Sequence, residues 1–377
     1  MSGNSLSSIP KEISKLTKLR IAFFANNSFT SVPSEFKELK NLYMLGFKAN
    51  QIETFDEDIL PKSISWLILT DNKIKKLPDS MGDLALLQKC AMAGNQIESI
   101  PSTMRNCKNL ELLRLSANKL KEIPQWLLEL PKLSWLAFSG NPCVTTPKFE
   151  LNCVEHKDLD VGKLLGEGAS GEIYQAYSKE LAKNVAIKFF KGAVTSDGYA
   201  VDEMNACLGV GEHENLIKVI AKIQGYEKLG LLLEYIPASF ANLGNPPNFD
   251  TCTRDTYEDD LEFSIASIKK IASSIASASA HMHEKNLMHG DLYAHNILVD
   301  NDSKCYLGDF GAASFYDSKM DGFQKIEVRA FGCLLDDLLT RCDDKTTKDY
   351  DSMCQLRDDC MSEDITLRPC FGEMIFN

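Results

Sequence analysis

The first 145 residues follow a hydrophobic pattern that repeats about every 23 residues. Asparagines recur at one position of the pattern, with a single step of 22, at Asn4, Asn27, Asn50, Asn72, Asn95, Asn118 and Asn141. Leu-x-x-Leu-x-Leu-x-x-Asn or a close variant precedes most of them, as at 110–118 and 133–141. A short strand with inward apolar positions and an asparagine turn cannot bury its apolar side alone, so neighbouring coils must stack. We therefore predict an array of six complete coils and a leading half coil over residues 1–145.

A different pattern begins after residues 146–157, which we expect to be a linker. Residues 164–176 predict a strand, a glycine-rich turn and a second strand, with Gly166, Gly168 and Gly171 in the turn. A dinucleotide-binding turn with this spacing opens a helix, whereas the β-branched and aromatic residues that follow Gly171 continue a strand. This favours a flap that lies over nucleotide phosphates.

The repeated segment resembles the leucine-rich-repeat family over residues 1–145. The outward strand positions of such an array form its concave face, and one column of them is Ile21, Met44, Trp66, Lys89, Leu112 and Trp135. Apolar side chains in a row on a curved surface indicate a protein-binding face. We expect a protein substrate or regulator to bind at Met44, Trp66, Leu112 and Trp135. The alternative is that this face packs on the second domain of the same chain.

Several motifs of the second region occur in the order typical of protein kinases. They are Val-Ala-Ile-Lys at 185–188, His-Gly-Asp-Leu-Tyr-Ala-His-Asn at 289–296, Asp-Phe-Gly at 309–311 and Arg-Pro at 368–369. Residues 158–377 resemble the eukaryotic-type protein kinases on these motifs. The fold class that both resemblances imply is an α/β leucine-rich-repeat solenoid followed by a bilobal α+β kinase fold. Its N-lobe would span about 158–236 and its C-lobe about 237–377.

The kinase resemblance also implies a role for each motif residue. Lys188 and Glu203 would align ATP, while Asp291 would orient the acceptor hydroxyl. Asn296 and Asp309 would bind Mg²⁺ through oxygen atoms. The remaining nucleotide contacts would come from Gly166, Gly168, Gly171, Ile173, Ala186 and the backbone of Glu234 and Ile236. The implied reaction is transfer of the γ-phosphate of ATP to a protein hydroxyl, with Ser or Thr favoured over Tyr.

Some positions depart from the kinase pattern. Gly290 replaces the arginine that commonly precedes the catalytic Asp and grips an activation-loop phosphate, so control by loop phosphorylation is not expected. The segment after Gly311 is short and lacks Ala-Pro-Glu, and Glu327 stands where an Asp is usual. Tyr293 and His295 occupy positions where kinases often carry Lys or Arg. Two alternatives stay open, a catalytically silent scaffold and a phosphotransferase that acts on small molecules.

Charge and composition limit which classes of partner and which cellular compartment we expect. The formal net charge of −12 and the lack of a Lys/Arg-rich patch argue against nucleic acid as a partner. The twelve cysteines show no Cys-x-x-Cys pair, which favours reduced core residues over a metal site. No segment approaches the roughly 18 apolar residues of a membrane span. We expect a cytoplasmic protein without a membrane span.

Overall fold

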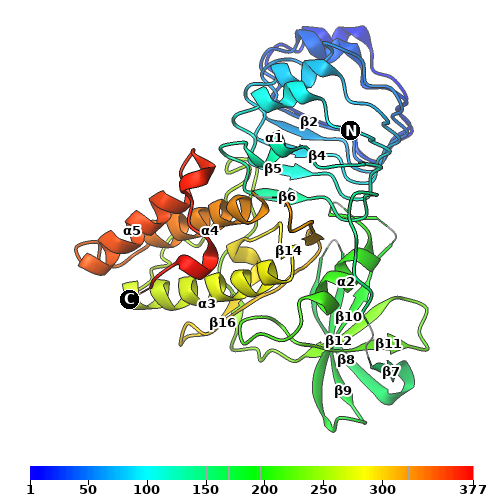
Figure 1. The fold of residues 1–377 in the computed structure, drawn as a ribbon. Coiled ribbons are helices and arrows are strands. Elements are labelled where there is room, and N and C mark those ends of the chain that lie inside the picture. Colours follow the sequence, from blue (N-terminus) through cyan, green and yellow to red (C-terminus); the bar gives the residue numbers. More distant parts are fainter. Residues whose placement is uncertain (150–151, 169, 193, 196, 321, 377) are drawn as a thin grey trace.

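The computed structural model describes residues 1–149, 152–168, 170–192, 194–195, 197–320 and 322–376. The chain forms a curved array of coils, a small lobe built on an antiparallel sheet and a larger helical lobe (Figure 1). The array, which we call the repeat array, lies against both lobes rather than apart from them. The chain therefore does not fold as two separate bodies joined by a tether.

The repeat array carries one short strand per coil, and the six strands form a parallel sheet. The strands are β1 (Ile21–Phe23), β2 (Met44–Gly46), β3 (Trp66–Ile68), β4 (Lys89–Ala91), β5 (Leu112–Arg114) and β6 (Trp135–Ala137). The opposite side of the coils carries short helices, which are η1 (Lys11–Lys15), η2 (Ser34–Glu38), η3 (Asp79–Asp83), η4 (Ser102–Asn106) and α1 (Gln125–Leu128). The register pairs Ile21, Met44, Trp66, Lys89, Leu112 and Trp135 across neighbouring strands, as the sequence column predicted.

The recurrent asparagines hold successive coils together. Asn50 Nδ2 donates to the carbonyl oxygen of Phe24 in the preceding coil at 2.9 Å, and Asn50 Oδ1 accepts from the backbone N–H of Phe29 at 3.1 Å. Asn72, Asn95, Asn118 and Asn141 repeat both contacts one coil further on. A buried amide with its donors and acceptor satisfied fixes the spacing of the coils, which explains the period of the sequence.

The small lobe is a six-stranded sheet in the order β7-β11-β12-β10-β9-β8, with one helix against it. Its elements are β7 (Cys153–Glu155), β8 (Leu159–Glu167), β9 (Gly171–Ser178), β10 (Lys183–Phe190), α2 (Ala200–Gly209), β11 (Val219–Gln224) and β12 (Gly230–Glu234), with η5 (His156–Asp158) before β8. The strand β7 lies inside the segment expected to be a linker, 146–157, and pairs in parallel with β11. Glu150 and Leu151 of that segment lie outside the described residues.

The large lobe is mostly helical. Its helices are α3 (Ile265–Glu284), α4 (Phe323–Thr340), α5 (Lys348–Cys360), η6 (Ala294–Asn296), η7 (Ile365–Leu367) and η8 (Phe371–Glu373). Its short strands are β13 (Ala241–Asn242), β14 (Leu287–Met288), β15 (Ile297–Val299), β16 (Cys305–Leu307) and β17 (Ser314–Phe315). The apolar sides of α3 and α4 pack on each other and bury a core that anchors the loops 289–296 and 308–311.

The concave face of the repeat array is covered by the chain itself. Only 1–8% of the surface remains exposed for the four side chains predicted to bind a partner, Met44, Trp66, Leu112 and Trp135. Cys252 of the large lobe packs on the first two, the Phe249 ring lies 5.9 Å from the Trp66 ring, and the Tyr293 ring stacks on Trp135 at 4.4 Å. The predicted partner site is therefore wrong, because the alternative packing on the second domain satisfies these apolar side chains.

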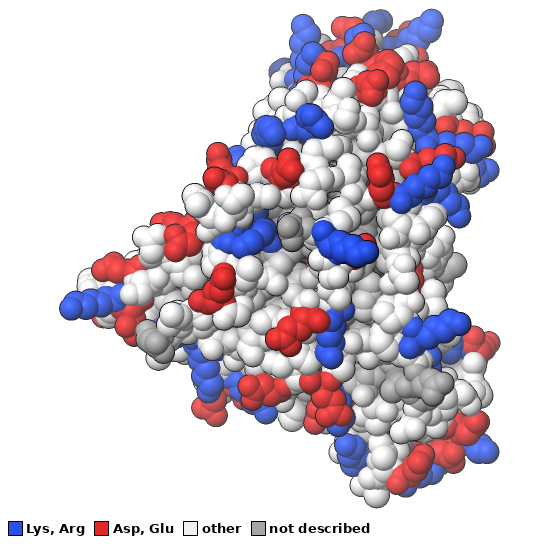
Figure 2. Space-filling model, in the orientation of Figure 1, with Lys and Arg blue, Asp and Glu red and all other residues white. Residues whose placement is uncertain are grey.

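Charge of both signs is spread over the surface. Figure 2 shows Lys and Arg interspersed with Asp and Glu on the face drawn, without a continuous basic area. In the part of the chain that the structure describes, no helix has the length and apolar character to cross a membrane.

Candidate active site

A buried ion pair joins the sheet of the small lobe to its helix. Lys188 on β10 contacts Glu203 on α2 through Nζ and Oε1, and both side chains are buried. Burial alone would lower the pKa of Lys188, but the carboxylates of Glu203 and Asp309 outweigh it and hold that pKa above its ordinary value. The Lys188 ammonium therefore stays charged and interacts electrostatically with the Asp309 carboxylate. The pairing matches the sequence expectation that Glu203 is the partner of Lys188.

The glycine-rich turn connects β8 to β9 as a hairpin. Gly168 N–H donates to the carbonyl oxygen of Gly171 at 2.9 Å. A Cβ on Gly166 or Gly168 would meet no atom within 4 Å, whereas one on Gly171 would lie 2.6 Å from the backbone oxygen of Phe189. Gly171 is thus required by packing, while the space beside Gly166 and Gly168 is open. Ile173 on β9 pairs with Lys188, which places it on the same part of the sheet.

The strand β12 brings the predicted adenine-binding backbone next to β10, which carries Lys188. Ala186 pairs with Leu233, and Val185 pairs with Glu234 at the end of β12. The backbone N–H of Glu234 already donates to Lys218 O at 2.9 Å. Ile236 lies two residues further on, and its backbone groups have no hydrogen-bond partner within the described residues. The backbone after Glu234 can therefore accept a ligand.

The loop 289–296 gathers the predicted catalytic side chains. Asn296 Nδ2 donates to the backbone oxygen of Asp291 at 2.9 Å and to its Oδ2 at 3.1 Å. Burial would raise the pKa of Asp291, but Arg114, His295 and His289 outweigh it and lower that pKa, so the carboxylate stays ionised. Asp309 adopts a left-handed backbone conformation, φ 53°, and accepts from Gly311 N–H at 3.2 Å. A Cβ on Gly311 would lie 3.3 Å from Asp309 Oδ1 and 3.7 Å from Glu203 Oε2, so both carboxylates border one point.

Glu327 on α4 fixes the backbone of this loop. Its carboxylate accepts from Gly290 N–H at 2.7 Å and from His289 N–H at 3.1 Å, and it lies 2.8 Å from His283 Nε2. Burial would raise its pKa, but the bond and charge of His283, with the Gly290 N–H, keep that pKa below the ordinary value of 4.5. Glu327 therefore holds the backbone of this loop in place, at a position where Asp is usual in the kinase pattern.

We expect Glu327→Ala to lower the free energy of unfolding by about 3 kcal/mol at pH 7, because buried donors lose their acceptor. Since the folded-state pKa of Glu327 is depressed, its contribution is complete above the unfolded-state pKa and is lost as the pH falls through the folded-state value. The gap to the parent protein should therefore narrow below pH 4.5. Thermal unfolding of the variant and the parent protein at several pH values measures this difference in stability. Glu284→Ala, an exposed position on α3, is the matched control, and an equal loss in both variants would contradict the assignment.

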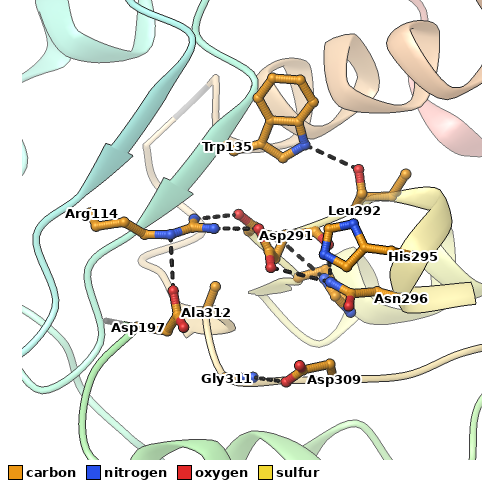
Figure 3. A network of polar contacts seen from close by, with 12 residues as sticks. Arg114, Trp135, Asp197, Asp291, Leu292, His295, Asn296, Asp309, Gly311 and Ala312 are labelled. Carbon is orange, nitrogen blue, oxygen red and sulfur yellow. Dashed lines mark hydrogen bonds and ion pairs between the residues drawn. The ribbon is translucent and has the colours of Figure 1, made fainter. Parts of the chain in front are cut away.

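One residue of the site comes from the repeat array and was not predicted. Arg114, at the end of β5, donates through Nη1 to the backbone oxygen of Gly290 at 2.9 Å and contacts Asp291 Oδ1 through Nη2 (Figure 3). Its Nε lies 3.0 Å from Asp197 Oδ1, in the loop that precedes α2. The side chain is 6% exposed. The only signal in the sequence was an arginine in the same outward column as Phe23 and Ile68.

The last coil of the array contacts the neighbouring backbone. Trp135 Nε1 donates to the backbone oxygen of Leu292 at 3.0 Å, as Figure 3 shows, and Phe138 N–H donates to Ser314 Oγ at 3.0 Å. Gly290 has φ 73°, and a Cβ there would lie 2.6 Å from the backbone oxygen of Leu136. The coil thus occupies the space of any side chain at position 290, which explains why the usual arginine is absent.

Comparison with known proteins agrees with this geometry. Residues 159–331 match the family described as protein kinase domain. The chain is similar to serine/threonine-protein kinase AtPK1/AtPK6 of Arabidopsis thaliana, at 29% identity over 163 residues, which are 42% of this chain and 32% of that protein. It is 30% identical to Aurora/IPL1-related protein kinase 2 of Caenorhabditis elegans over 175 residues, 45% of this chain and 52% of that protein. Fibroblast growth factor receptor 1 of Xenopus laevis is 27% identical over 222 residues, 52% of this chain and 26% of that protein.

These matches define the class of the domain. Residues 159–331 match a protein kinase domain, and two of these relatives are named as protein kinases, which are enzymes. The chain spans between 26% and 52% of the length of the relatives described. The likeness therefore concerns the kinase domain and not the rest of those proteins.

Proposed function

We propose that the chain is an ATP- and Mg²⁺-dependent protein kinase that transfers the γ-phosphate to a protein hydroxyl, with Ser or Thr favoured over Tyr. The observation that carries this proposal is the buried Lys188–Glu203 pair with Asp309 beside it. A charged ammonium held by a helix carboxylate is the arrangement that positions the phosphates of ATP. The names of the serine/threonine-protein kinase and Aurora/IPL1-related relatives support the same activity.

The described residues fit ATP and Mg²⁺. Asp309 is an exposed carboxylate, and its oxygen atoms and those of Asn296 are hard ligands of the kind that Mg²⁺ prefers. Within the described part of the chain, no three His, Cys, Asp or Glu side chains form a metal cage. Asn296 and Asp309 would therefore hold the ion together with phosphate oxygens, as Mg²⁺ sites in phosphotransferases do. The bound ion would offset the negative charge that develops on the phosphoryl group.

The remaining predicted residues take roles consistent with their positions. The hairpin of Gly166, Gly168 and Gly171, with Ile173, would cover the nucleotide, while Ala186, Glu234 and Ile236 would line its base. The acceptor oxygen forms a bond to the γ-phosphorus as the bond to the β–γ bridging oxygen breaks, and ADP leaves. Asp291 would orient the acceptor hydroxyl and accept its proton. Because that carboxylate is ionised at neutral pH, it is ready for this role without a prior deprotonation.

We further propose that the repeat array is a leucine-rich-repeat solenoid. Six parallel strands in register, with one buried asparagine per coil bonded to the coil before it, support this assignment. Its concave face is covered by the kinase domain, so recruitment of a substrate or regulator through that face is not part of the proposal.

A silent scaffold is the main alternative, and it predicts nucleotide binding without transfer. Labelled ATP with Mg²⁺ distinguishes the two, with autophosphorylation and generic Ser/Thr and Tyr protein substrates as readouts. We expect transfer by the parent protein and a loss of at least about a hundredfold in Asp291→Asn, the range of general acid–base contributions. Asp302→Asn, an exposed carboxylate in the turn after β15, is the control and should match the parent.

Nucleotide binding without label in the parent protein would support the scaffold instead. Transfer to free aminoglycosides, choline or related alcohols, but not to any protein, would support a small-molecule phosphotransferase.

A further inference from the structure

The guanidinium of Arg114 connects three parts of the chain at one point. Arg114 itself belongs to β5 of the repeat array, Asp291 and the Gly290 carbonyl belong to the catalytic loop, and Asp197 belongs to the loop that leads into α2. That helix carries Glu203, three residues after its first residue. A single buried side chain therefore links the loop that carries Asp291 to the helix whose Glu203 pairs with Lys188.

The loop 289–296, which we call the catalytic loop, has no lysine or arginine of its own to pair with Asp291. Position 290 is glycine, and position 293 is Tyr293, whose ring lies between Trp135 and His295. His295 is engaged elsewhere, since its Nδ1 lies 2.7 Å from Asp255 Oδ1 and its backbone N–H donates to Asp255 Oδ2 at 3.1 Å. Among the described groups, the Nη2 of Arg114 is the cationic atom in direct contact with the Asp291 carboxylate.

The contact is part of a continuous apolar interface, which argues against a removable lid. Met288, Phe323 and Ile326 of the large lobe belong to the same core as the leucines of the array, and Phe138 stacks on Phe323 at 5.1 Å. Trp135 and Leu112 of the array belong in turn to the core of the large lobe. Separation would expose these side chains together, and interfaces that resemble a domain core are permanent ones.

Buried polar groups reinforce the same interface. Arg329 on α4 donates to Ser134 Oγ at 2.7 Å, and Arg368 donates to the backbone oxygen of Pro131 at 2.6 Å. Both arginines are buried, and withdrawing the array would break these two hydrogen bonds. The array is therefore permanently packed against the catalytic site and forms one side of it.

We propose that Arg114 is a positioning residue of the phosphotransfer site, supplied by the repeat array in place of a lysine or arginine within the catalytic loop. It binds Asp291 Oδ1 and leaves Oδ2, which Asn296 contacts, directed to the acceptor. Through Asp197 it also fixes the approach of α2. This inference rests on the proposed kinase function and extends it, because it makes the array a component of the active site rather than a recruiting or inhibitory module.

The test uses the full chain with Arg114→Met, Arg114→Lys and Arg114→Ala. We expect Arg114→Met to lower kcat for phosphate transfer at least about tenfold, since displacement of a catalytic group by 1 Å can cost about a hundredfold. KM for ATP should change less than threefold by the same reasoning, because the nucleotide contacts lie in the small lobe. Arg114→Lys should recover part of kcat, and millimolar guanidinium should raise the rate of Arg114→Ala but not of the parent. Arg105→Met, an exposed arginine in η4 of the same array, is the matched control and should be unchanged.

Two outcomes would overturn the proposal. A rate in Arg114→Met equal to the parent would show that the contact is dispensable, and a higher rate would show that the array represses the kinase. Hydrogen exchange gives a readout that does not depend on catalysis. Faster exchange at 287–299 and 197–203 in Arg114→Met, but not in Arg105→Met, supports the positioning role, and unchanged exchange contradicts it. A parent without transfer activity but with this exchange difference would reject the proposed function alone.

Discussion

A chain that begins at residue 146 and so lacks the repeat array is expected to be insoluble or to unfold without cooperativity. Removing the array uncovers Met288, Tyr293 and Phe323 at once, each at most 5% exposed in the intact chain. Burying one such side chain contributes roughly 1.5–3 kcal/mol. The loss of several together exceeds a large part of the 5–15 kcal/mol that typically stabilises a domain. Soluble yield and thermal unfolding of residues 146–377 against the full chain measure the effect.

Complementation is the control for this truncation. Because the contacts between the array and the lobes are non-covalent in the described structure, residues 1–145 expressed with residues 146–377 as a second chain should restore a soluble complex. A monomeric truncated protein with a cooperative unfolding transition close to that of the full chain would refute the permanent interface. It would also favour an array that detaches from the kinase domain.

Local patterns in the sequence predicted most of the architecture. The 23-residue spacing of asparagines gave the coils and the strand register, because each amide must reach the backbone of the preceding coil. A partner for Lys188 in the following helix could likewise be predicted, with Glu203 as the best candidate and Asp202 as its alternative, and the structure pairs Lys188 with Glu203. The roles of these residues in catalysis remain predictions until transfer is measured.

How the repeat array packs on the kinase-like region could not be predicted from local patterns. An apolar column such as Met44, Trp66, Leu112 and Trp135 has the same appearance in sequence whether a separate partner or the chain itself covers it. Arg114 was missed for the same reason, since its partner Asp291 lies 177 residues further on. Neither a period nor a motif specifies which surfaces of two distant segments are complementary. That information lies in shape, as the glycine at position 290 beneath Leu136 demonstrates.

The short segment after Gly311 carries three hydroxyl side chains, on Ser314, Tyr316 and Ser318, whose surroundings differ. Ser314 is buried and accepts from Phe138 N–H, and the Tyr316 hydroxyl lies 2.8 Å from His283 Nδ1. Both contribute to packing against the array and α3, so neither is presented for phosphorylation in this arrangement. Ser318 is exposed and is the hydroxyl of the three that a kinase can reach.

Replacing Gly290 is the substitution expected to disturb the interface most. Gly290→Ala should lower the free energy of unfolding by at least about 3 kcal/mol, the sum of left-handed strain and forced overpacking. The added Cβ would lie 2.6 Å from Leu136 O and 2.7 Å from Ala312 O. Gly290→Arg, which restores the residue common in kinases, should cost at least about 4 kcal/mol because a guanidinium must also be buried. Chemical denaturation of both variants provides the measurement.

The chain offers a control that separates strain from clash. Gly211 has nearly the same backbone conformation, φ 70°, but a Cβ there would meet only the Lys285 side chain at 3.7 Å or more. Gly211→Ala should therefore cost only the roughly 1–2 kcal/mol of left-handed strain. The difference between the two alanine variants then measures the combined steric contact of position 290 with Leu136 O of β6 and with Ala312 O. If Gly290→Ala costs no more than Gly211→Ala, the array does not press on the loop, and the explanation for the missing arginine fails with it.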